Sequence, residues 1–193
     1  MSSKGYTKTL GGIYLLETAI SEEDCDWLVS SVGENWDFKS LDPVDDLPVW
    51  QTKDTGEHDC PSFLYEYAKN VCDKFLIDKI CSLYRFSKAK LRGSALWPFI
   101  RRYKPKEYGR DSFKLHSDPT YFTATFLLSD PSEFSGGNFL IQPYWFLLPK
   151  AIQMKKGDCL IFKGRKRHGV SELTEGVRHS MSFFLWDRTN EYQ

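Results

Sequence analysis

A histidine and an aspartate stand two positions apart in the segment Phe113–Pro119, as His116 and Asp118. In an extended strand, residues i and i+2 project from the same face, so this imidazole and this carboxylate can reach one point in space. Imidazole nitrogens and carboxylate oxygens are common metal ligands, and the pair therefore indicates a metal site. Taken alone, a motif this short also arises by chance.

The residues that follow argue against a chance origin. His168 lies after two further strand-like segments and could complete a set of two histidines and one carboxylate. Such a set holds Fe(II) while leaving coordination positions open for other ligands. Arg178 follows ten positions later, and its planar guanidinium can grip a carboxylate. The ordered combination predicts an iron site with an anion-binding residue just beyond its third ligand.

The second half of the chain, from Trp97 to Arg188, carries a resemblance to a known family. The matching residues are, in order, Tyr103, His116-x-Asp118, Gly136-Gly137, Gly157–Phe162, His168, Gly176-Val177-Arg178-x-Ser180 and Trp186. This run resembles the 2-oxoglutarate and Fe(II)-dependent dioxygenases, and within them it looks most like the prolyl and lysyl hydroxylase branch, which includes the prolyl 4-hydroxylases. The combination is far more specific than any one of its motifs.

The resemblance implies a set of cofactors and a role for each site residue. The implied iron ligands are His116, Asp118 and His168. The implied co-substrates are 2-oxoglutarate and dioxygen, ascorbate is a further candidate, and no catalytic side chain is expected beyond the metal centre. Arg178 matches the basic residue that binds the C5 carboxylate of 2-oxoglutarate. Tyr103 matches a phenol that hydrogen-bonds the same carboxylate, although Tyr108 would also suit the spacing.

Strand alternation adds two candidates for binding the co-substrate. On a strand that begins after Gly176, Arg178 and Ser180 share one face and His179 points away. Ser180 can therefore add a hydroxyl donor beside the guanidinium. Thr125, on the strand after the His-x-Asp motif, could touch the co-substrate, although packing is the commoner role for such a residue.

The charged residues also have a plainer interpretation as surface groups. Arg178 could pair with a nearby glutamate at the surface, but such a pair would not explain its spacing from His168. Two basic clusters, within residues 101–110 and 163–167, should lie near the mouth of the barrel and could recognise an acidic or phosphate-bearing substrate. A solvated face explains them equally well, and neither supports a nucleic-acid site.

The composition limits the class of protein. At 193 residues the chain can bury a core without disulfide or metal staples. Lys plus Arg equals Asp plus Glu, at 26 each, so no global field favours nucleic acid or a membrane as a partner. Five cysteines without a C-x-x-C pair indicate reduced thiols. Without a signal peptide or an apolar run long enough to span a bilayer, we expect a soluble, cytoplasmic protein.

The hydrophobic period changes near residue 91. Ser21 followed by acidic residues is typical of a helix start, and apolar residues spaced three and four apart predict a helix over Pro61–Ile80. Period-two runs punctuated by Gly and Pro then predict several short strands. We expect a mainly β protein with flanking helices: a double-stranded β-helix, or jelly roll, over residues 91–188, supported by the helices and loop of residues 1–90 in one domain, 1–193.

Residues 36–56 have no clear period and contain two prolines and a cluster of aspartates, which predicts an irregular connection. A loop of this length often serves as a lid or a substrate-binding element, and surface packing without substrate contact is an equally good interpretation. Within it, Trp36 and Trp50 are the candidates for contact with a ligand, because exposed aromatic side chains on loops often have that role.

The leading hypothesis for function is an oxygenase that couples the decarboxylation of 2-oxoglutarate to hydroxylation of an unactivated C–H bond. By resemblance, the substrate would be a prolyl or lysyl residue of a protein or peptide, and a free amino acid or another small molecule would also fit. The alternative is a non-catalytic, cupin-like metal-binding or sensing module, which would not need the Arg178–Ser180 clamp. A halogenase is disfavoured, because Asp118 occupies the position that those relatives leave open for halide. The sequence leaves the oligomeric state open.

Overall fold

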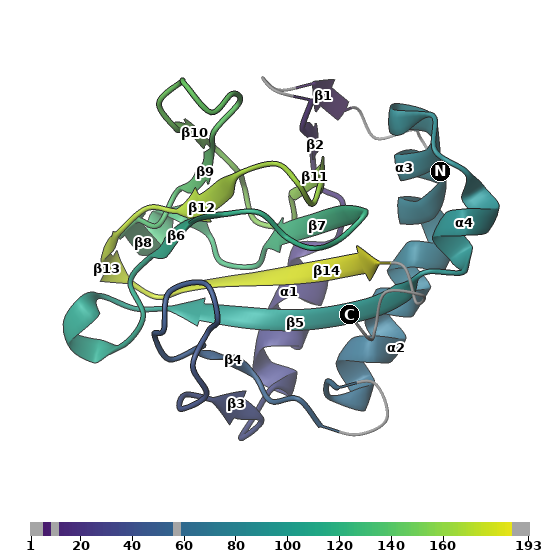
Figure 1. The fold of residues 1–193 in the computed structure, drawn as a ribbon. Helices are drawn as coiled ribbons and strands as arrows, with labels where there is room; N and C mark the ends of the chain where they lie inside the picture. The colour runs from purple at the N-terminus through teal and green to yellow at the C-terminus, as the bar shows by residue number, and fades with distance from the viewer. Residues whose placement is uncertain (1–5, 9–11, 56–58, 187–193) are drawn as a thin grey trace.

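A sheet of eight antiparallel strands forms the centre of the protein (Figure 1). The computed structural model describes residues 6–8, 12–55 and 59–186. The order of the large sheet is β1 (Tyr6–Lys8), β2 (Tyr14–Leu16), β11 (Cys159–Lys163), β7 (Phe122–Leu127), β14 (Arg178–Trp186), β5 (Ala95–Tyr103), β4 (Gln51–Thr52) and β3 (Trp36–Asp37). Strands from both halves of the chain therefore share one sheet.

A smaller sheet faces part of the large one. Its four strands are β10 (Lys150–Ile152), β9 (Phe139–Ile141), β12 (His168–Val170) and β6 (Phe113–His116), and a separate pair joins β13 (Leu173–Gly176) to β8 (Phe134–Gly136). Phe139 and Ile141 of the small sheet pack against Leu160 and Phe162 of the large one. This arrangement confirms the predicted jelly roll with flanking helices.

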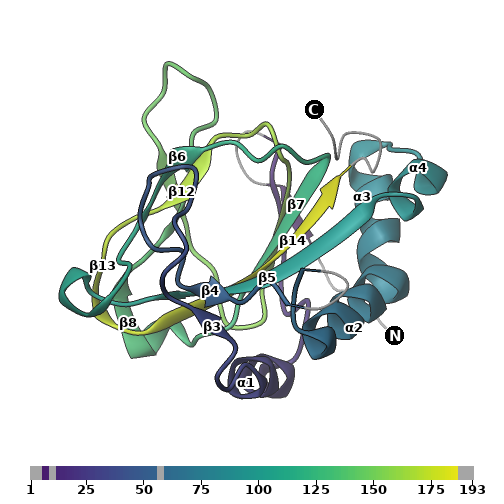
Figure 2. The ribbon, with the colours of Figure 1, turned by 60° about the horizontal axis from the view of Figure 1, so that its bottom comes forward.

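The helices cover the opposite face of the large sheet (Figure 2). They are α1 (Glu22–Ser31), α2 (Ser62–Val71), α3 (Ile77–Tyr84) and α4 (Lys88–Arg92), with a π-helical segment, η1 (Cys72–Leu76), between α2 and α3. Two short 3-10 turns, η2 (Lys106–Tyr108) and η3 (Pro131–Glu133), lie outside this layer. Among the described residues, no helix is both long and apolar enough to cross a membrane.

Local signals explain where the helices begin better than where they end. Ser21 caps α1 as predicted, because its hydroxyl accepts a hydrogen bond from the Asp24 backbone N–H at 3.0 Å. The helical stretch predicted over Pro61–Ile80 continues four residues further, to Tyr84, and contains the π-helical turn. It ends where Arg85 adopts a left-handed conformation, with φ 51°. No glycine marks that end in the sequence, so the pattern could not locate it.

The side chains of β14 alternate between the core and the site. Met181, Phe183 and Leu185 are buried against the helical layer. The intervening side chains, which begin with Arg178 and Ser180, face a cavity between the two sheets. The same alternation in β7 sends Thr123 and Thr125 into this cavity. In both strands, the side chains on one face line the cavity and the side chains on the other face belong to the core.

Candidate metal centre

His116, Asp118 and His168 come together at one end of the small sheet. His116 ends β6, His168 begins β12, and the two residues lie opposite each other in the pairing of these strands. His116 Nε2 lies 3.1 Å from Asp118 Oδ1, and His168 Nε2 lies 3.4 Å from Asp118 Oδ2. One ligand atom from each residue falls within 4.8 Å of the others, a spacing that one metal ion could bridge.

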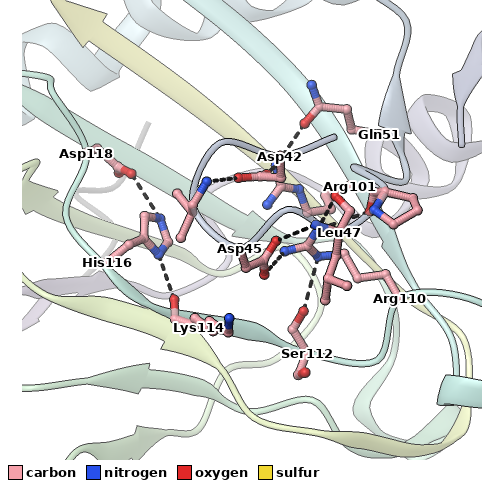
Figure 3. Close-up of polar contacts among 12 residues, drawn as sticks. Asp42, Asp45, Leu47, Gln51, Arg101, Arg110, Ser112, Lys114, His116 and Asp118 are labelled. Carbon is pink, nitrogen blue, oxygen red and sulfur yellow. Dashed lines mark hydrogen bonds and ion pairs between the residues drawn. The ribbon is translucent and has the colours of Figure 1, made fainter. Parts of the chain in front are cut away.

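Backbone carbonyls orient both imidazoles. The Nδ1 atom of His116 lies 2.9 Å from the Lys114 carbonyl (Figure 3). The Nδ1 atom of His168 lies 2.8 Å from the Lys166 carbonyl. Each Nδ1–H can donate to its carbonyl, which leaves the Nε2 lone pair free and directed toward Asp118. Burial lowers the pKa of His168 to about 4, so its ring is neutral near pH 7, as a metal ligand must be.

Two further contacts hold the carboxylate of Asp118 in place. The Thr123 hydroxyl donates to Oδ2 at 2.6 Å, and the Asp118 backbone N–H donates to the Gly164 carbonyl at 2.9 Å. Burial by itself would raise the pKa of Asp118, but the nearby imidazoles of His116 and His168 and the hydrogen bond from Thr123 lower it below its ordinary value. The group is therefore an anion at neutral pH.

Gly164 permits the close approach of the two loops that meet here. A Cβ at this position would lie 2.3 Å from Thr120 Oγ1 and 2.7 Å from the Asp118 carbonyl oxygen. No larger residue fits without moving the loop that carries Asp118.

Arg178 is buried beside Tyr103, its partner across the β14–β5 pairing. Only 2% of Arg178 is exposed, and its guanidinium carbon lies 5.2 Å from the centre of the Tyr103 ring. Its Nη1 atom is buried and has no hydrogen-bond partner among the described residues. A buried cationic donor without a partner is costly, so this geometry favours an anionic ligand and disagrees with a surface ion pair.

A cavity of about 360 Å³ joins these features. Its lining includes the three metal-binding candidates together with Tyr103, Thr125, Arg178 and Ser180. Tyr108, the alternative to Tyr103, is 67% exposed and does not line the cavity. Thr125 contacts the neighbouring hydroxyl of Ser182 at 3.1 Å. The structure thus brings every predicted site residue to one cavity.

The two tryptophans of the 36–56 connection lie away from the cavity. Residues 40–44 of this segment line the cavity, as do Val49 and Gln51, but neither Trp36 nor Trp50 does. Trp36 lies against His179, on the face of β14 that points away from the cavity, and Trp50 packs on Phe38. Their places follow from strand pairing, which the irregular sequence pattern did not reveal. Gly56 lies outside the described residues.

Part of the first basic cluster is neither solvated nor free for a substrate. Arg101 donates to Asp42 Oδ2 and to Gln51 Oε1, both at 2.9 Å, and lines the cavity (Figure 3). Arg110 pairs with Asp45 at 2.5 Å, and both side chains are almost fully buried. These contacts join residues 50 to 65 positions apart, so no local signal could have identified them.

Comparison with known proteins places this fold in a class. No family model matches the chain. Among solved structures it is similar to a prolyl hydroxylase from Trichoplax adhaerens in complex with a hypoxia inducible factor peptide, with a TM-score of 0.63 and 14% identity over 95% of this chain and 88% of that one. It is also similar to a non-heme alpha ketoglutarate dependent carbocyclase of nogalamycin biosynthesis, with a TM-score of 0.65 and 15% identity over 92% and 80%. These likenesses define the fold as that of the 2-oxoglutarate and Fe(II)-dependent oxygenases.

The sequence gives a more particular likeness. Over 126 residues the chain is 27% identical to a PKHD-type hydroxylase of Parvibaculum lavamentivorans, a match that covers 58% of this chain and 52% of that protein. A PKHD-type hydroxylase of Pseudomonas putida is 28% identical over 125 residues. The chain therefore spans about half the length of the curated relatives it matches. The chain is thus similar in sequence to PKHD-type hydroxylases and in fold to 2-oxoglutarate oxygenases that include a prolyl hydroxylase, which are the likenesses that the motifs indicated.

Proposed function

We propose that the chain is an Fe(II)- and 2-oxoglutarate-dependent hydroxylase that works as one catalytic domain over residues 1–193. One observation carries the proposal: a buried guanidinium, that of Arg178, has an unpartnered donor in the cavity that also holds His116, Asp118 and His168. A module that only binds metal has no use for such a group. A dicarboxylate co-substrate would satisfy it and would also reach the metal.

The residues present fit the proposed iron and co-substrate. His116, Asp118 and His168 would hold Fe(II), which with dioxygen supplies the oxidising power for C–H hydroxylation when bound. Arg178 would grip the C5 carboxylate of 2-oxoglutarate, with Ser180 and the Tyr103 hydroxyl as further donors and Thr125 beside them. Ascorbate is a further candidate as a reductant.

The walls of the cavity would exclude water from the reacting groups. Phe113 and Phe139 lie beside the metal set, and Trp97, Phe99 and Phe184 line another part of the cavity. An apolar enclosure strengthens the electrostatic interactions inside it and protects reactive species from side reactions. The residues 40–44 that line the cavity would then act as a lid over the substrate.

The proposed substrate is a prolyl or lysyl residue in a protein or peptide. The peptide complex of the Trichoplax prolyl hydroxylase supports this choice, and the names of the sequence relatives support a hydroxylase in general. The carbocyclase has the same fold, so a free amino acid or another small molecule is the second candidate. Succinate release measured over a panel of peptides and small amines would separate the two, because only a true substrate should stimulate it strongly.

Spectroscopy without oxygen tests the co-substrate site directly. Anaerobic addition of Fe(II) and 2-oxoglutarate should produce a weak metal-to-ligand charge-transfer band in the visible. Arg178→Ala and His116→Ala should lose it, whereas Arg102→Ala, an arginine on the opposite face, should keep it. Metal binding with neither the band nor succinate in air would instead identify a cupin-like binding module and would refute the hydroxylase.

A further inference from the structure

The connection between β9 and β10 exposes five large apolar side chains in a row. Tyr144, Trp145, Phe146, Leu147 and Leu148 stand between two prolines, and Trp145 and Leu148 are 83% and 85% exposed. The loop projects from the body of the protein in both views (Figures 1 and 2). Single apolar side chains are common on protein surfaces, but a contiguous group of this size marks an interaction site. We call Tyr144–Leu148 the apolar loop.

Hydrogen bonds give the apolar loop a defined shape. The side-chain amide of Gln142 donates to the carbonyls of Trp145 and Leu147, at 3.2 and 2.9 Å. The rings of Tyr144 and Phe146 stack with their centres 5.7 Å apart. None of the five side chains lines the cavity, so the loop presents its apolar atoms outward instead of completing the active site.

Basic residues lie on the segments next to the base of this loop. The Gln142 backbone N–H donates to the Arg167 carbonyl at 2.9 Å, which holds the 165–167 turn beside it, and Lys150 follows directly after the second proline. Lys150, Arg165 and Arg167 are exposed. Residues 134–157 and 159–171 contain no Asp or Glu, so this region is strongly basic in a chain whose net charge is zero.

We propose that the apolar loop, with Lys150, Arg165 and Arg167, binds the surface of an anionic lipid bilayer. Trp and Tyr side chains favour the bilayer interface, Phe and Leu favour the acyl region below it, and Lys and Arg bind anionic headgroups. A projecting tip with a basic base suits insertion into a soft surface, whereas a protein partner would need a groove to receive it. The net charge of zero gave no reason to expect a membrane partner. Net charge is a sum over the whole chain, however, and does not reveal a local group of basic residues.

The metal set lies close to this surface in the fold. Ile141, the last residue of β9 before the loop, pairs with His168 of β12, which in turn pairs with His116. A bound bilayer would therefore meet the end of the small sheet that carries the proposed iron site. Membrane binding itself needs neither iron nor turnover, so it can be tested independently of the proposed function.

Vesicle flotation of the full chain tests the proposal. The probes are vesicles of phosphatidylcholine alone and of phosphatidylcholine with phosphatidylserine, without added iron or 2-oxoglutarate. We expect binding to the anionic vesicles only, weaker by about ten-fold or more in the double variant Trp145→Ser with Leu148→Ser. A similar loss is expected for Arg165→Glu with Arg167→Glu, and in 0.5 M salt, where charges are screened within about 4 Å.

Matched controls separate a specific surface from general stickiness. Tyr108→Ser removes another exposed aromatic side chain, and Lys69→Glu with Arg92→Glu reverses two exposed charges on the helices; both should bind as wild type does. Circular dichroism checks that each variant is folded. Failure of the wild type to bind anionic vesicles, or equal binding by the loop variant, would overturn the proposal. So would loop-dependent self-association seen by light scattering without vesicle binding, because a second copy would then be the partner.

Discussion

At the scale of single residues, the site depends on groups that support the proposed ligands as much as on the ligands themselves. Thr123 donates to the Asp118 carboxylate, and two backbone carbonyls select the tautomers of the histidines. Such outer contacts fix ligand orientation and basicity. They turn three side chains that could bind a metal into a set that is already aimed at one point.

Removing the Thr123 hydroxyl should weaken metal binding without unfolding the protein. Thr123→Val keeps the shape of the side chain but removes the donor to Asp118. We expect the affinity for Fe(II) or Mn(II), measured by anaerobic titration calorimetry, to fall by about 10- to 100-fold. Thr174→Val, at an exposed threonine outside the cavity, is the control and should bind as wild type does. An unchanged affinity in Thr123→Val would show that the hydrogen bond does not tune the site.

His179 should make the fold less stable in weak acid. Burial and the nearby charges of Arg102 and Arg178 lower its pKa to about 4, whereas the unfolded chain should have a pKa of about 6.5. The unfolded state then binds more protons, so stability falls as the pH drops from 6.5 toward 4. We expect a contribution of about 1 to 2 kcal/mol between pH 7 and pH 5, measured by urea unfolding. His179→Gln should lose that share of the pH dependence, and an identical pH profile would exclude this ring as its source.

At the scale of elements, buried ion pairs attach an irregular segment to the sheet. Asp42 pairs with Arg101 of β5, and Asp45 pairs with Arg110 just before β6. Both guanidinium groups also lie within 4.4 Å of the centre of the Phe113 ring. The residues between β3 and β4 thus have a fixed place at the cavity despite their lack of regular structure.

Breaking one of these pairs should release the segment. Asp45→Asn would leave the charge of Arg110 buried and unpaired, at a cost of about 3 kcal/mol in unfolding free energy. Limited proteolysis should then cut between residues 37 and 54 faster than in wild type. Asp46→Asn, at an exposed aspartate one position away, should change neither measurement. Equal protection of the two variants would mean that the ion pair does not anchor the segment.

At the scale of the whole molecule, the proposed site joins three separate parts of the chain. His116 and His168 come from the paired strands β6 and β12 of the small sheet, and Asp118 lies two positions after the end of β6. Arg178 comes from the large sheet, and residues 40–44 line the cavity from the N-terminal half of the chain. Ligands that bridge these parts should stabilise the folded state as a whole, because they bind only when all parts are in place.

Thermal unfolding should therefore report both ligands. At concentrations about 100-fold above Kd, Mn(II) alone should stabilise the wild type by about 2.7 kcal/mol, a rise in Tm of about 5 to 10 °C, and 2-oxoglutarate should add to it only when the metal is present. Arg178→Ala should keep the metal effect and lose the second increment. His168→Ala should lose both. A response to 2-oxoglutarate that survives in both variants would locate its site elsewhere.

Local patterns account for what the sequence by itself determined. Arg178 and Ser180 point to the opposite face from His179 because side chains alternate along a strand. The start of α1 follows from the capping hydrogen bond of Ser21. The order of motifs identified the three side chains that the fold brings within 4.8 Å. The strand facing and the helix start depend on residues close together in the chain. The metal-binding candidates were identified from the order of motifs along it.

Tertiary structure decided the features that depend on distant neighbours. It put Tyr103 at the cavity and Tyr108 in solvent, turned Trp36 away from the site, and paired Arg101 with Asp42 across 59 positions. It also left Tyr144–Leu148 uncovered, although large apolar side chains are more often buried. The physical reason is the same in each case: burial and pairing depend on which surfaces meet when the sheets close, and a one-dimensional pattern does not contain that information.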